Sequence, residues 1–185
     1  EIAVLRREGL APGLFWLGGY RSDLTGGKAS ALDGFGVASG IGVTRFDYSG
    51  HGRSGGDFLD GTISRWLEEA LAVFASTEGP QIVIGSSMGG WLALLLNRAL
   101  RSAGNDRVRA LILIAPAVDM TEELMRKSFT RREQKALREH GIVEQPSEYS
   151  AEPYPITAGL IEDGARHLLF GTGITTGCPV TILQG

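Results

Sequence analysis

The chain has 185 residues, of which 43% are hydrophobic and 21% charged, with a formal net charge of −3. That length suffices for one domain with a substantial core. Nucleic-acid binding is not expected, because the chain has no excess of basic residues that would drive contacts with phosphates. No apolar run reaches the roughly 18 residues of a membrane-spanning helix. The sequence therefore predicts a globular protein without a membrane span.

The one cysteine, Cys178, excludes an internal disulfide and is typical of a reducing compartment. We therefore expect a cytoplasmic protein. The chain opens on Glu1 rather than on a methionine, so the sequence leaves open a targeting segment before it. It also leaves the oligomeric state open.

Short apolar runs alternate with helical patterns along most of the chain. Strands are expected at 3–5, 13–17, 43–48, 81–84, 108–114 and 179–183. Helices are expected at 28–38, at 63–74 with Thr62 as N-cap, and from Met88 to about Gly104. Buried strands that alternate with helices predict an α/β fold, a mostly parallel sheet with helices on both faces.

Residues 118–170 break this alternation. Charged helical stretches are expected at 121–127 and 131–140, a turn at 145–149 and a further helix at 156–169. Because this segment lies between two predicted sheet strands, we interpret it as a lid or cap inserted in a single domain that spans residues 1–185.

Two features of the predicted lid stay open at this point. The first is a basic cluster, which is either a solvated helix face or a surface that attracts anionic acyl donors; its members are Arg126, Lys127, Arg131, Arg132, Lys135 and Arg138. The second is a set of aromatic residues that either line an acyl pocket or pack loops, namely Phe129, Tyr149 and Tyr154.

The residues 85–89 read Gly-Ser-Ser-Met-Gly and separate a predicted strand from a predicted helix. A G-x-S-x-G motif in this context is typical of a nucleophile elbow, in which Ser87 projects from the end of the sheet on a strained backbone. Gly85 and Gly89 would then approach a neighbouring strand and helix too closely for a Cβ atom. The plainer interpretation is a turn between two buried elements.

Four motifs together resemble the α/β-hydrolase superfamily of serine hydrolases. They are residues 17–20 (Leu-Gly-Gly-Tyr), 47–54 (Asp-Tyr-Ser-Gly-His-Gly-Arg-Ser), the elbow around Ser87, and 183–185 (Leu-Gln-Gly). Within that superfamily, residues 46–50, 79–81, 85–91 and 146–150 look like the abhydrolase-type acyl-protein thioesterases and acyl-glucuronide esterases and their bacterial relatives. The resemblance covers nearly the whole chain.

The resemblance implies an α/β-hydrolase fold and hydrolysis of a small-molecule carboxylic ester or thioester through an acyl-enzyme. Ser87 would be the nucleophile, and the backbone N–H groups of Tyr20 and Met88 would form the oxyanion hole. Gly18 stands where many relatives carry histidine, which matters little because the donor is a backbone group. No cofactor and no metal are implied.

In this superfamily the catalytic acid and histidine follow the serine in chain order, after the strand matched by residues 180–183. The sequence stops at Gly185, before either position. We therefore expect a domain that is incomplete at its C-terminus, with the triad acid and histidine outside this chain.

Three histidines inside the chain are weaker candidates for the base. The resemblance makes His51 a loop-structuring residue, and His140 is expected at the C-terminal end of a lid helix. His167 follows Asp163 by four residues, a spacing that is typical of a surface hydrogen bond on one helix face. A triad instead needs the acid on the far side of the imidazole from the serine.

Other motifs are set aside. Residues 50–55 match G-x-G-x-x-G, but no helix begins within the motif, as dinucleotide binding requires. Gly27 and Lys28 lack the rest of a P-loop, and His51, Asp57 and Asp60 have no metal-ligand spacing.

The alternatives to a hydrolase are a non-catalytic binding module and an inactive fragment. Haloperoxidase or C–C hydrolase chemistry on the same fold also stays open. The sequence does not identify the acyl group or the leaving group.

Overall fold

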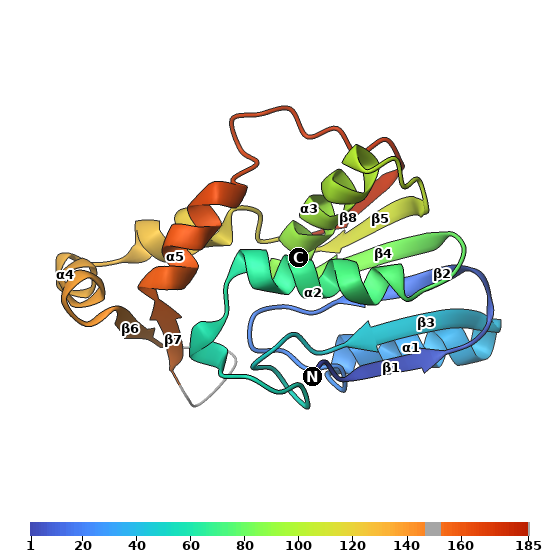
Figure 1. Ribbon diagram of the computed structural model, residues 1–185, viewed down its shortest axis with the longest axis horizontal. Helices are drawn as coiled ribbons and strands as arrows, with labels where there is room; N and C mark the ends of the chain where they lie inside the picture. Colours follow the sequence, from blue (N-terminus) through green and yellow to red (C-terminus); the bar gives the residue numbers. More distant parts are fainter. Residues whose placement is uncertain (147–152, 185) are drawn as a thin grey trace.

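The computed structural model describes residues 1–146 and 153–184, which form a twisted sheet with helices on both faces and a smaller lobe at one end (Figure 1). Six strands pair in the order β1-β3-β2-β4-β5-β8. They are β1 (Val4–Arg7), β2 (Leu10–Leu17), β3 (Ile41–Phe46), β4 (Gln81–Ser86), β5 (Val108–Ile114) and β8 (Val180–Leu183). Only β1 runs antiparallel to its neighbour, so the predicted α/β fold with a mostly parallel sheet is confirmed.

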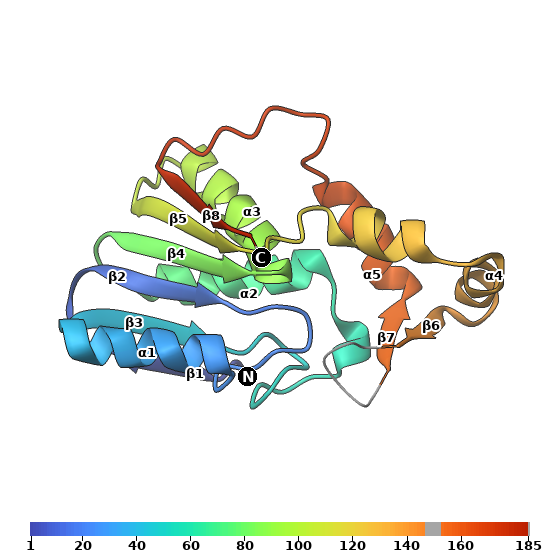
Figure 2. The same cartoon turned by 180° about the vertical axis from the view of Figure 1, so that it is seen from behind.

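Helices cover the sheet from two sides. The helices α2 (Ile63–Ala75) and α3 (Met88–Ser102) lie on the face seen in Figure 1, whereas α1 (Gly27–Ser39) lies on the face seen in Figure 2. Strand β2 shows why two layers are needed. Its side chains alternate between a large core under α2 and α3, which includes Phe15, and a smaller core under α1, which includes Trp16. This strand is therefore buried on both faces, as predicted.

Local signals in the sequence determine several element ends. Thr62 is the N-cap of α2, and its side chain accepts a hydrogen bond from Arg65 N, as expected. Helix α3 ends at Ser102, and Gly104 follows in a left-handed conformation with φ = 73°. Strand β3 begins and ends two residues earlier than the predicted 43–48, since it spans Ile41–Phe46.

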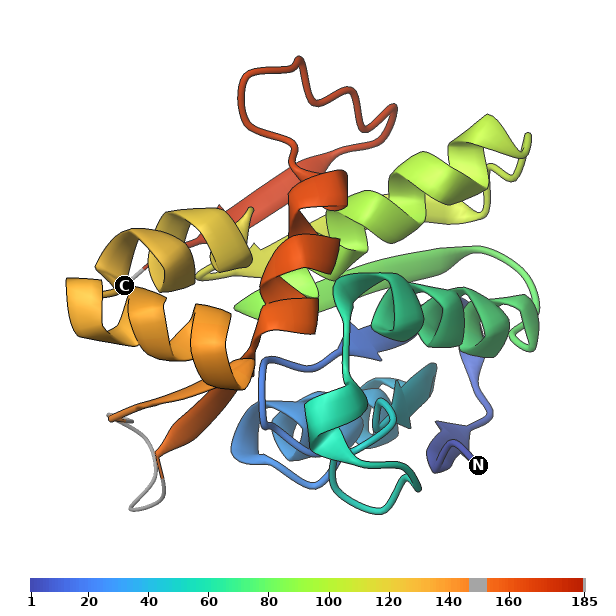
Figure 3. The ribbon, with the colours of Figure 1, turned by 60° about the vertical axis from the view of Figure 1, so that its left-hand side comes forward.

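Residues 118–170, here called the insertion, lie between β5 and β8 in the chain and beyond the carboxyl ends of the parallel strands (Figures 1 and 3). Its elements are a π-helical turn η2 (Thr121–Met125), the 3₁₀ turn η3 (Arg126–Ser128), α4 (Arg131–His140), β6 (Ile142–Gln145), β7 (Tyr154–Thr157), α5 (Ala158–Gly164) and the 3₁₀ turn η4 (Ala165–His167). A further 3₁₀ turn, η1 (Phe58–Asp60), precedes α2.

The predicted helix over 156–169 is wrong at both ends. Strand β7 occupies residues 154–157 and pairs antiparallel with β6, a hairpin that the sequence did not predict. The β-branched pair Ile156 and Thr157 suits a strand, and the Thr157 side chain then caps α5 by accepting from Leu160 N. The helix is therefore shorter and passes into η4. Residues 147–149 of the predicted turn, including Tyr149, lie outside the described residues.

A buried carboxylate closes the neck of the insertion. Asp119, which is 2% exposed, stands at its start and accepts hydrogen bonds from Leu169 N (2.8 and 3.1 Å) and Phe170 N (2.8 Å) at its end. Trp91 of α3 adds a bond from Nε1 to the carbonyl oxygen of His167 (3.3 Å). The Asp119 bonds thus join the two ends of the insertion to each other, and the Trp91 bond attaches its C-terminal end to the body of the domain.

We expect Asp119→Asn to lower the free energy of unfolding by about 2 kcal/mol, because an amide offers one acceptor oxygen to two backbone donors and turns an N–H group toward them. Urea denaturation followed by circular dichroism would measure the loss. The matched control is Asp106→Asn, an exposed position whose replacement should change stability by less than about 0.5 kcal/mol. Equal stability of the two variants would contradict the proposed role of Asp119.

Candidate active site

Ser87 occupies the sharp turn between β4 and α3. Its φ of 54° and ψ of −120° place a non-glycine residue in a region that costs on the order of 1–3 kcal/mol. Three hydrogen bonds hold the turn: Ser87 N donates to Ile114 O (3.0 Å), and Ser87 O accepts from Gly90 N (2.8 Å) and Ala117 N (3.0 Å). The end of β5, the segment that follows it and the first turn of α3 thus hold the strained backbone, and the side chain of Ser87 is half-buried.

The two glycines of the motif make the turn sterically possible. A Cβ atom on Gly85 would collide with the carbonyl oxygen of Gly89 in α3, and a Cβ atom on Gly89 would collide with the carbonyl oxygen of Leu17 in β2. The elbow helix can therefore pack directly onto the strand ends. The predicted strand–turn–helix arrangement is present, with the close approaches that were expected.

Residues 18–21, here called the donor loop, lie against this turn. A Cβ atom on Gly19 would be 3.4 Å from Ser87 Cβ and 3.3 Å from Ser86 O, so the loop backbone contacts the elbow. Tyr20 follows Gly19, and Met88 follows Ser87. Within the described residues, neither the Tyr20 N–H nor the Met88 N–H donates to a protein acceptor. Met88 thus adjoins Ser87 in the chain, and Tyr20 follows a glycine whose backbone contacts the turn at Ser87.

The Tyr20 side chain anchors the donor loop to the insertion. Its hydroxyl donates to Pro155 O (2.6 Å), and its ring packs edge-on against Phe58, Trp66 and Tyr154. Burial raises the pKa of the Tyr20 hydroxyl well above its usual range, so it remains a donor at any ordinary pH. The sequence pointed only to the backbone of Tyr20, because a partner in β7 is visible only in the fold.

His51 supports the donor loop from the other side. Its Nε2 accepts a hydrogen bond from Arg21 N (3.1 Å), and its Nδ1 lies 3.1 Å from Ser49 O, to which it must therefore donate. The ring is 3% exposed. Burial lowers the pKa of His51, which keeps the imidazole neutral and Nε2 free to accept. Both ring nitrogens are occupied, in agreement with a loop-structuring role.

The other two histidines lie in the insertion. His140 ends α4, as predicted for a residue at a helix C-terminus. His167 directs Nε2 to the hydroxyl of Ser64 in α2, at 2.7 Å, and lies 3.8 Å from a carboxylate oxygen of Asp163. None of the three histidines forms a hydrogen bond with Ser87 in the part of the chain that the structure describes.

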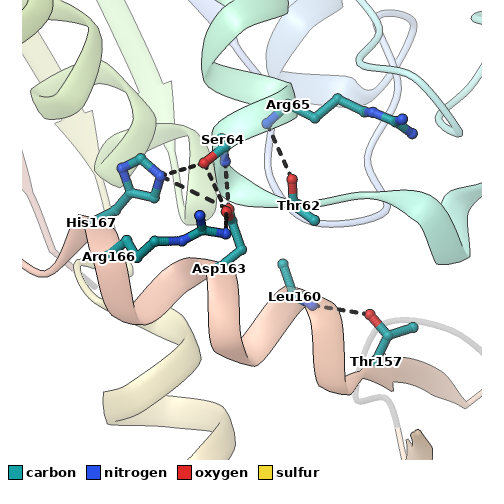
Figure 4. A network of polar contacts seen from close by, with 8 residues as sticks. All are labelled: Thr62, Ser64, Arg65, Thr157, Leu160, Asp163, Arg166 and His167. Atoms are coloured by element: carbon teal, nitrogen blue, oxygen red, sulfur yellow. Dashed lines mark hydrogen bonds and ion pairs between the residues drawn. The ribbon is translucent and has the colours of Figure 1, made fainter.

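The Asp163 carboxylate is a buried helix cap rather than the surface partner that was predicted (Figure 4). It is 3% exposed and accepts from Ser64 N (2.7 Å) and Ser64 Oγ (2.8 Å), in the first turn of α2, while Arg166 Nη2 lies at 2.6 Å. The predicted proximity of Asp163 and His167 on one helix face is confirmed. Both side chains, however, contact the hydroxyl of Ser64. Carboxylate and imidazole therefore do not form a serine–histidine–acid relay.

Two pockets are lined wholly or partly by residues of the insertion. One, of about 420 Å³, lies within the insertion and includes Phe129 and Leu137 in its lining. The other, of about 370 Å³, includes Arg21 and Phe58. Phe129 and Tyr154 do not share a pocket, since Tyr154 packs on Tyr20.

Arg21 is a residue that the sequence analysis missed. The only local signal was its position directly after Gly-Gly-Tyr. Its importance for the site comes from its side-chain neighbours in the folded chain.

The described residues were compared with the requirements of a metal site and of a membrane-spanning helix. Among them no group of three or more histidine, cysteine or acidic side chains is arranged to hold a metal ion. No helix in the same part of the chain has the length and apolar character to cross a bilayer. Cys178 is a free, half-buried thiol whose pKa is raised by burial.

The family described as serine aminopeptidase, S33, matches residues 35–148. Among curated proteins, bovine palmitoyl-protein thioesterase ABHD10, mitochondrial, is 36% identical over 189 residues, which cover 100% of this chain and 60% of that protein. This chain thus spans about 60% of the length of the curated relatives it matches.

Two solved structures are also similar to this chain in fold and sequence. A protein from Agrobacterium vitis S4 whose name assigns it to the hydrolases is 49% identical, with a TM-score of 0.94, over 98% of this chain and 72% of that one. Mouse α/β-hydrolase domain-containing protein 10 is 35% identical, with a TM-score of 0.87, over 100% of this chain and 72% of that one.

We expect Asp163→Ala to lower the free energy of unfolding by about 2–3 kcal/mol, because it leaves a buried backbone donor of α2 and the Ser64 hydroxyl without their acceptor. Urea denaturation at pH 7 would measure the loss. The neighbouring Glu162, on the exposed side of the same helix, supplies the control variant Glu162→Ala, which should change little. A loss of similar size in both variants would point to helix propensity rather than capping.

We expect stability to fall as the pH drops below about 6.5, because burial lowers the pKa of both His51 and His167 below that usual value. The unfolded chain then takes up protons first, so the stabilisation is complete above the unfolded pKa and is lost as the pH falls through the folded one. Urea midpoints at pH 7.5, 6.5 and 5.5 would measure the trend.

Burial is the largest cause of the lowered pKa of His51, and the charge of Arg21 lowers it further. The carboxylates of Asp47 and Glu69 act in the opposite direction and raise it. The variant His51→Gln should therefore lose stability less steeply with falling pH than the wild type. Parallel pH profiles for the two proteins would contradict the assignment to His51.

Proposed function

Because this chain belongs to the α/β-hydrolase family, in the group described as serine aminopeptidase, S33, we propose that it hydrolyses carboxylic esters or thioesters through an acyl-enzyme on Ser87. One observation carries the proposal: Ser87 stands at positive φ between β4 and α3, with the donor loop packed against it. Gly85 and Gly89 permit this geometry. The backbone N–H groups of Tyr20 and Met88 are the proposed oxyanion donors.

The proposed reaction has two balanced halves. Ser87 Oγ attacks the carbonyl carbon while its proton passes to an imidazole, and the negative charge that develops on the carbonyl oxygen is stabilised by the two N–H groups and the N-terminus of α3. The tetrahedral intermediate collapses to the acyl-enzyme, and the alcohol or thiol leaves with the proton. Water then repeats these steps and releases the acid. This scheme uses no cofactor.

We further propose that the triad acid and histidine come from residues outside this sequence. Both ring nitrogens of His51 are hydrogen-bonded, to Arg21 N and Ser49 O, and Nε2 of His167 is bonded to Ser64. His140 lies at the end of α4. The relatives that match this chain are longer, which leaves room for such residues. A second candidate, a binding module without catalysis, is favoured by the same absence of a histidine bonded to Ser87 within the described residues.

The insertion is proposed to act as the lid of the domain. Its position beyond the carboxyl ends of the strands supports this role, as do the hydrogen bonds that the donor loop donates to Pro155 O of β7 and to Pro153 O just before it. The proposed substrate is a small-molecule acyl ester or thioester, a class suggested by the thioesterase names of the mammalian relatives. The cytoplasmic location predicted from the sequence stays a prediction, and those relatives carry the word mitochondrial in their names.

We expect a fluorophosphonate probe to label the full-length protein at Ser87, and Ser87→Ala to abolish labelling and lower kcat/KM for an acetate ester by about 10⁴-fold or more. Intact mass and peptide mapping would identify the labelled residue. The matched control is Ser86→Ala, which alters the adjacent serine. Labelling and turnover that persist in Ser87→Ala would overturn the proposed function.

The 185-residue chain by itself should stay unlabelled while remaining folded by circular dichroism. Labelling of this chain at Ser87 would show that a base within it activates the serine. The proposal that the histidine lies outside would then be wrong.

A further inference from the structure

The peptide unit between Gly19 and Tyr20 carries one of the two N–H groups that are proposed to bind the oxyanion. This peptide bond is trans. In a trans peptide the C=O and N–H groups lie in one plane and point in opposite directions. The contacts that hold the Gly19 carbonyl oxygen therefore also determine the direction of the Tyr20 N–H.

Ser22 holds this carbonyl oxygen with two hydrogen bonds. Gly19 O accepts from Ser22 N (3.1 Å) and from Ser22 Oγ (2.9 Å). The first bond closes a tight turn over residues 19–22, in which Arg21 has a φ of 57°. A glycine backbone rotates freely unless contacts restrain it. Because the carbonyl of Gly19 is directed at Ser22, the N–H of Tyr20 is directed away from Ser22.

The Tyr20 hydroxyl holds the same turn from the side of the insertion. It donates to Pro155 O (2.6 Å), 135 positions further along the chain. The ring lies in a cluster of aromatic side chains, with centroids 4.9 Å from Phe58, 5.9 Å from Tyr154 and 6.0 Å from Trp66. Since the backbone of Tyr20 carries both this side chain and the N–H group, a bond to β7 restrains the proposed oxyanion donor.

The turn also lies against the nucleophile elbow. A Cβ atom on Gly19 would be 3.3 Å from Ser86 O and 3.4 Å from Ser87 Cβ. Removal of one oxyanion donor lowers kcat by roughly 10²–10³-fold, and a misplacement of about 1 Å in a reacting geometry has a comparable effect. Bonds that fix this peptide should therefore influence the rate of the chemical steps more than the binding of the substrate.

We propose that the side-chain hydroxyls of Ser22 and Tyr20 position the oxyanion donor. Ser22 orients the peptide locally, through the carbonyl of Gly19. Tyr20 couples the same peptide to the insertion, through the carbonyl of Pro155, so the insertion contributes to catalysis without contacting the reacting atoms. Both are positioning residues, and the inference rests on the proposed hydrolysis at Ser87.

Two conservative variants of the full-length protein test the inference. Tyr20→Phe removes the hydroxyl and keeps the ring in its cluster, and Ser22→Ala removes the Oγ bond and keeps the backbone bond. We expect each to lower kcat for an acetate ester by about tenfold or more while KM changes by less than about twofold. Steady-state kinetics on the two variants and the wild type would measure both constants.

Each variant has a matched control. Tyr48→Phe removes a hydroxyl that is buried without a hydrogen-bond partner among the described residues, on a ring that also packs near Trp66. Ser30→Ala removes a hydroxyl that donates to Thr25 O (2.8 Å) in α1, away from the elbow. Both controls should leave kcat and KM within about twofold of the wild type.

Inhibition by octyl trifluoromethyl ketone separates positioning from a loss of folded protein. Ser87 Oγ adds to the ketone carbonyl carbon, the Oγ proton passes to the imidazole, and the resulting alkoxide occupies the oxyanion hole. We expect the inhibition constant to rise about tenfold in Tyr20→Phe and in Ser22→Ala. A smaller folded fraction would lower kcat but would leave the inhibition constant unchanged.

A wild-type inhibition constant in either variant would overturn the role of that hydroxyl, and an equal rise in the control variants would overturn both roles. The variant Ser87→Ala distinguishes these failures from a failure of the proposed function. If it still turns over the ester, the proposed function is wrong and the inference is wrong with it. If turnover depends on Ser87 but Tyr20→Phe and Ser22→Ala match the wild type, the inference alone is overturned.

Discussion

The close packing of α3 onto the ends of β2 and β4 is the constraint on which the rest of the structure depends. Gly85 and Gly89 lack the Cβ atoms that would separate these elements, so the backbone passes from strand to helix in one residue. That residue, Ser87, takes a strained conformation, which is held in place by bonds to the end of β5, to Ala117 and to the first turn of α3. The core beneath, with Trp91 and Leu92 fully buried, stabilises this arrangement.

The insertion is coupled to the rest of the domain through polar contacts as well as through a shared apolar core, to which it contributes Met120, Leu160 and Ile161. Asp119 closes the neck, Asp163 caps α2, and the Tyr20 hydroxyl bonds to β7. Each contact satisfies a backbone group that burial would otherwise leave without a partner. A carboxylate at the N-terminus of α2 also interacts favourably with the helix dipole. The geometry of the donor loop is therefore inseparable from the position of the insertion.

Burial and hydrogen bonding determine which titratable side chain donates and which accepts around the donor loop. His51 is kept neutral so that it can accept from Arg21 N, whereas Tyr20 is kept protonated so that it can donate to Pro155 O. Arg21 follows Tyr20 in the chain, its N–H donates to His51, and its guanidinium lies against Phe58 and Tyr154. A residue that looks ordinary in the sequence thus acquires a defined orientation from three segments that are distant along the chain.

The sequence alone was sufficient for most strands and helices and for the strand–turn–helix arrangement around Ser87. These features depend on local periodicity, capping residues and the spacing of Gly85, Ser87 and Gly89, which the chain carries within short windows. The sequence was insufficient for the β6–β7 hairpin, the capping role of Asp163 and the surroundings of Arg21. Those depend on pairings between residues far apart in the chain, such as Tyr20 with Pro155 at 135 positions and Arg21 with Pro153 at 132. Only the tertiary structure decides such contacts, because they form where burial forces distant polar groups to satisfy one another.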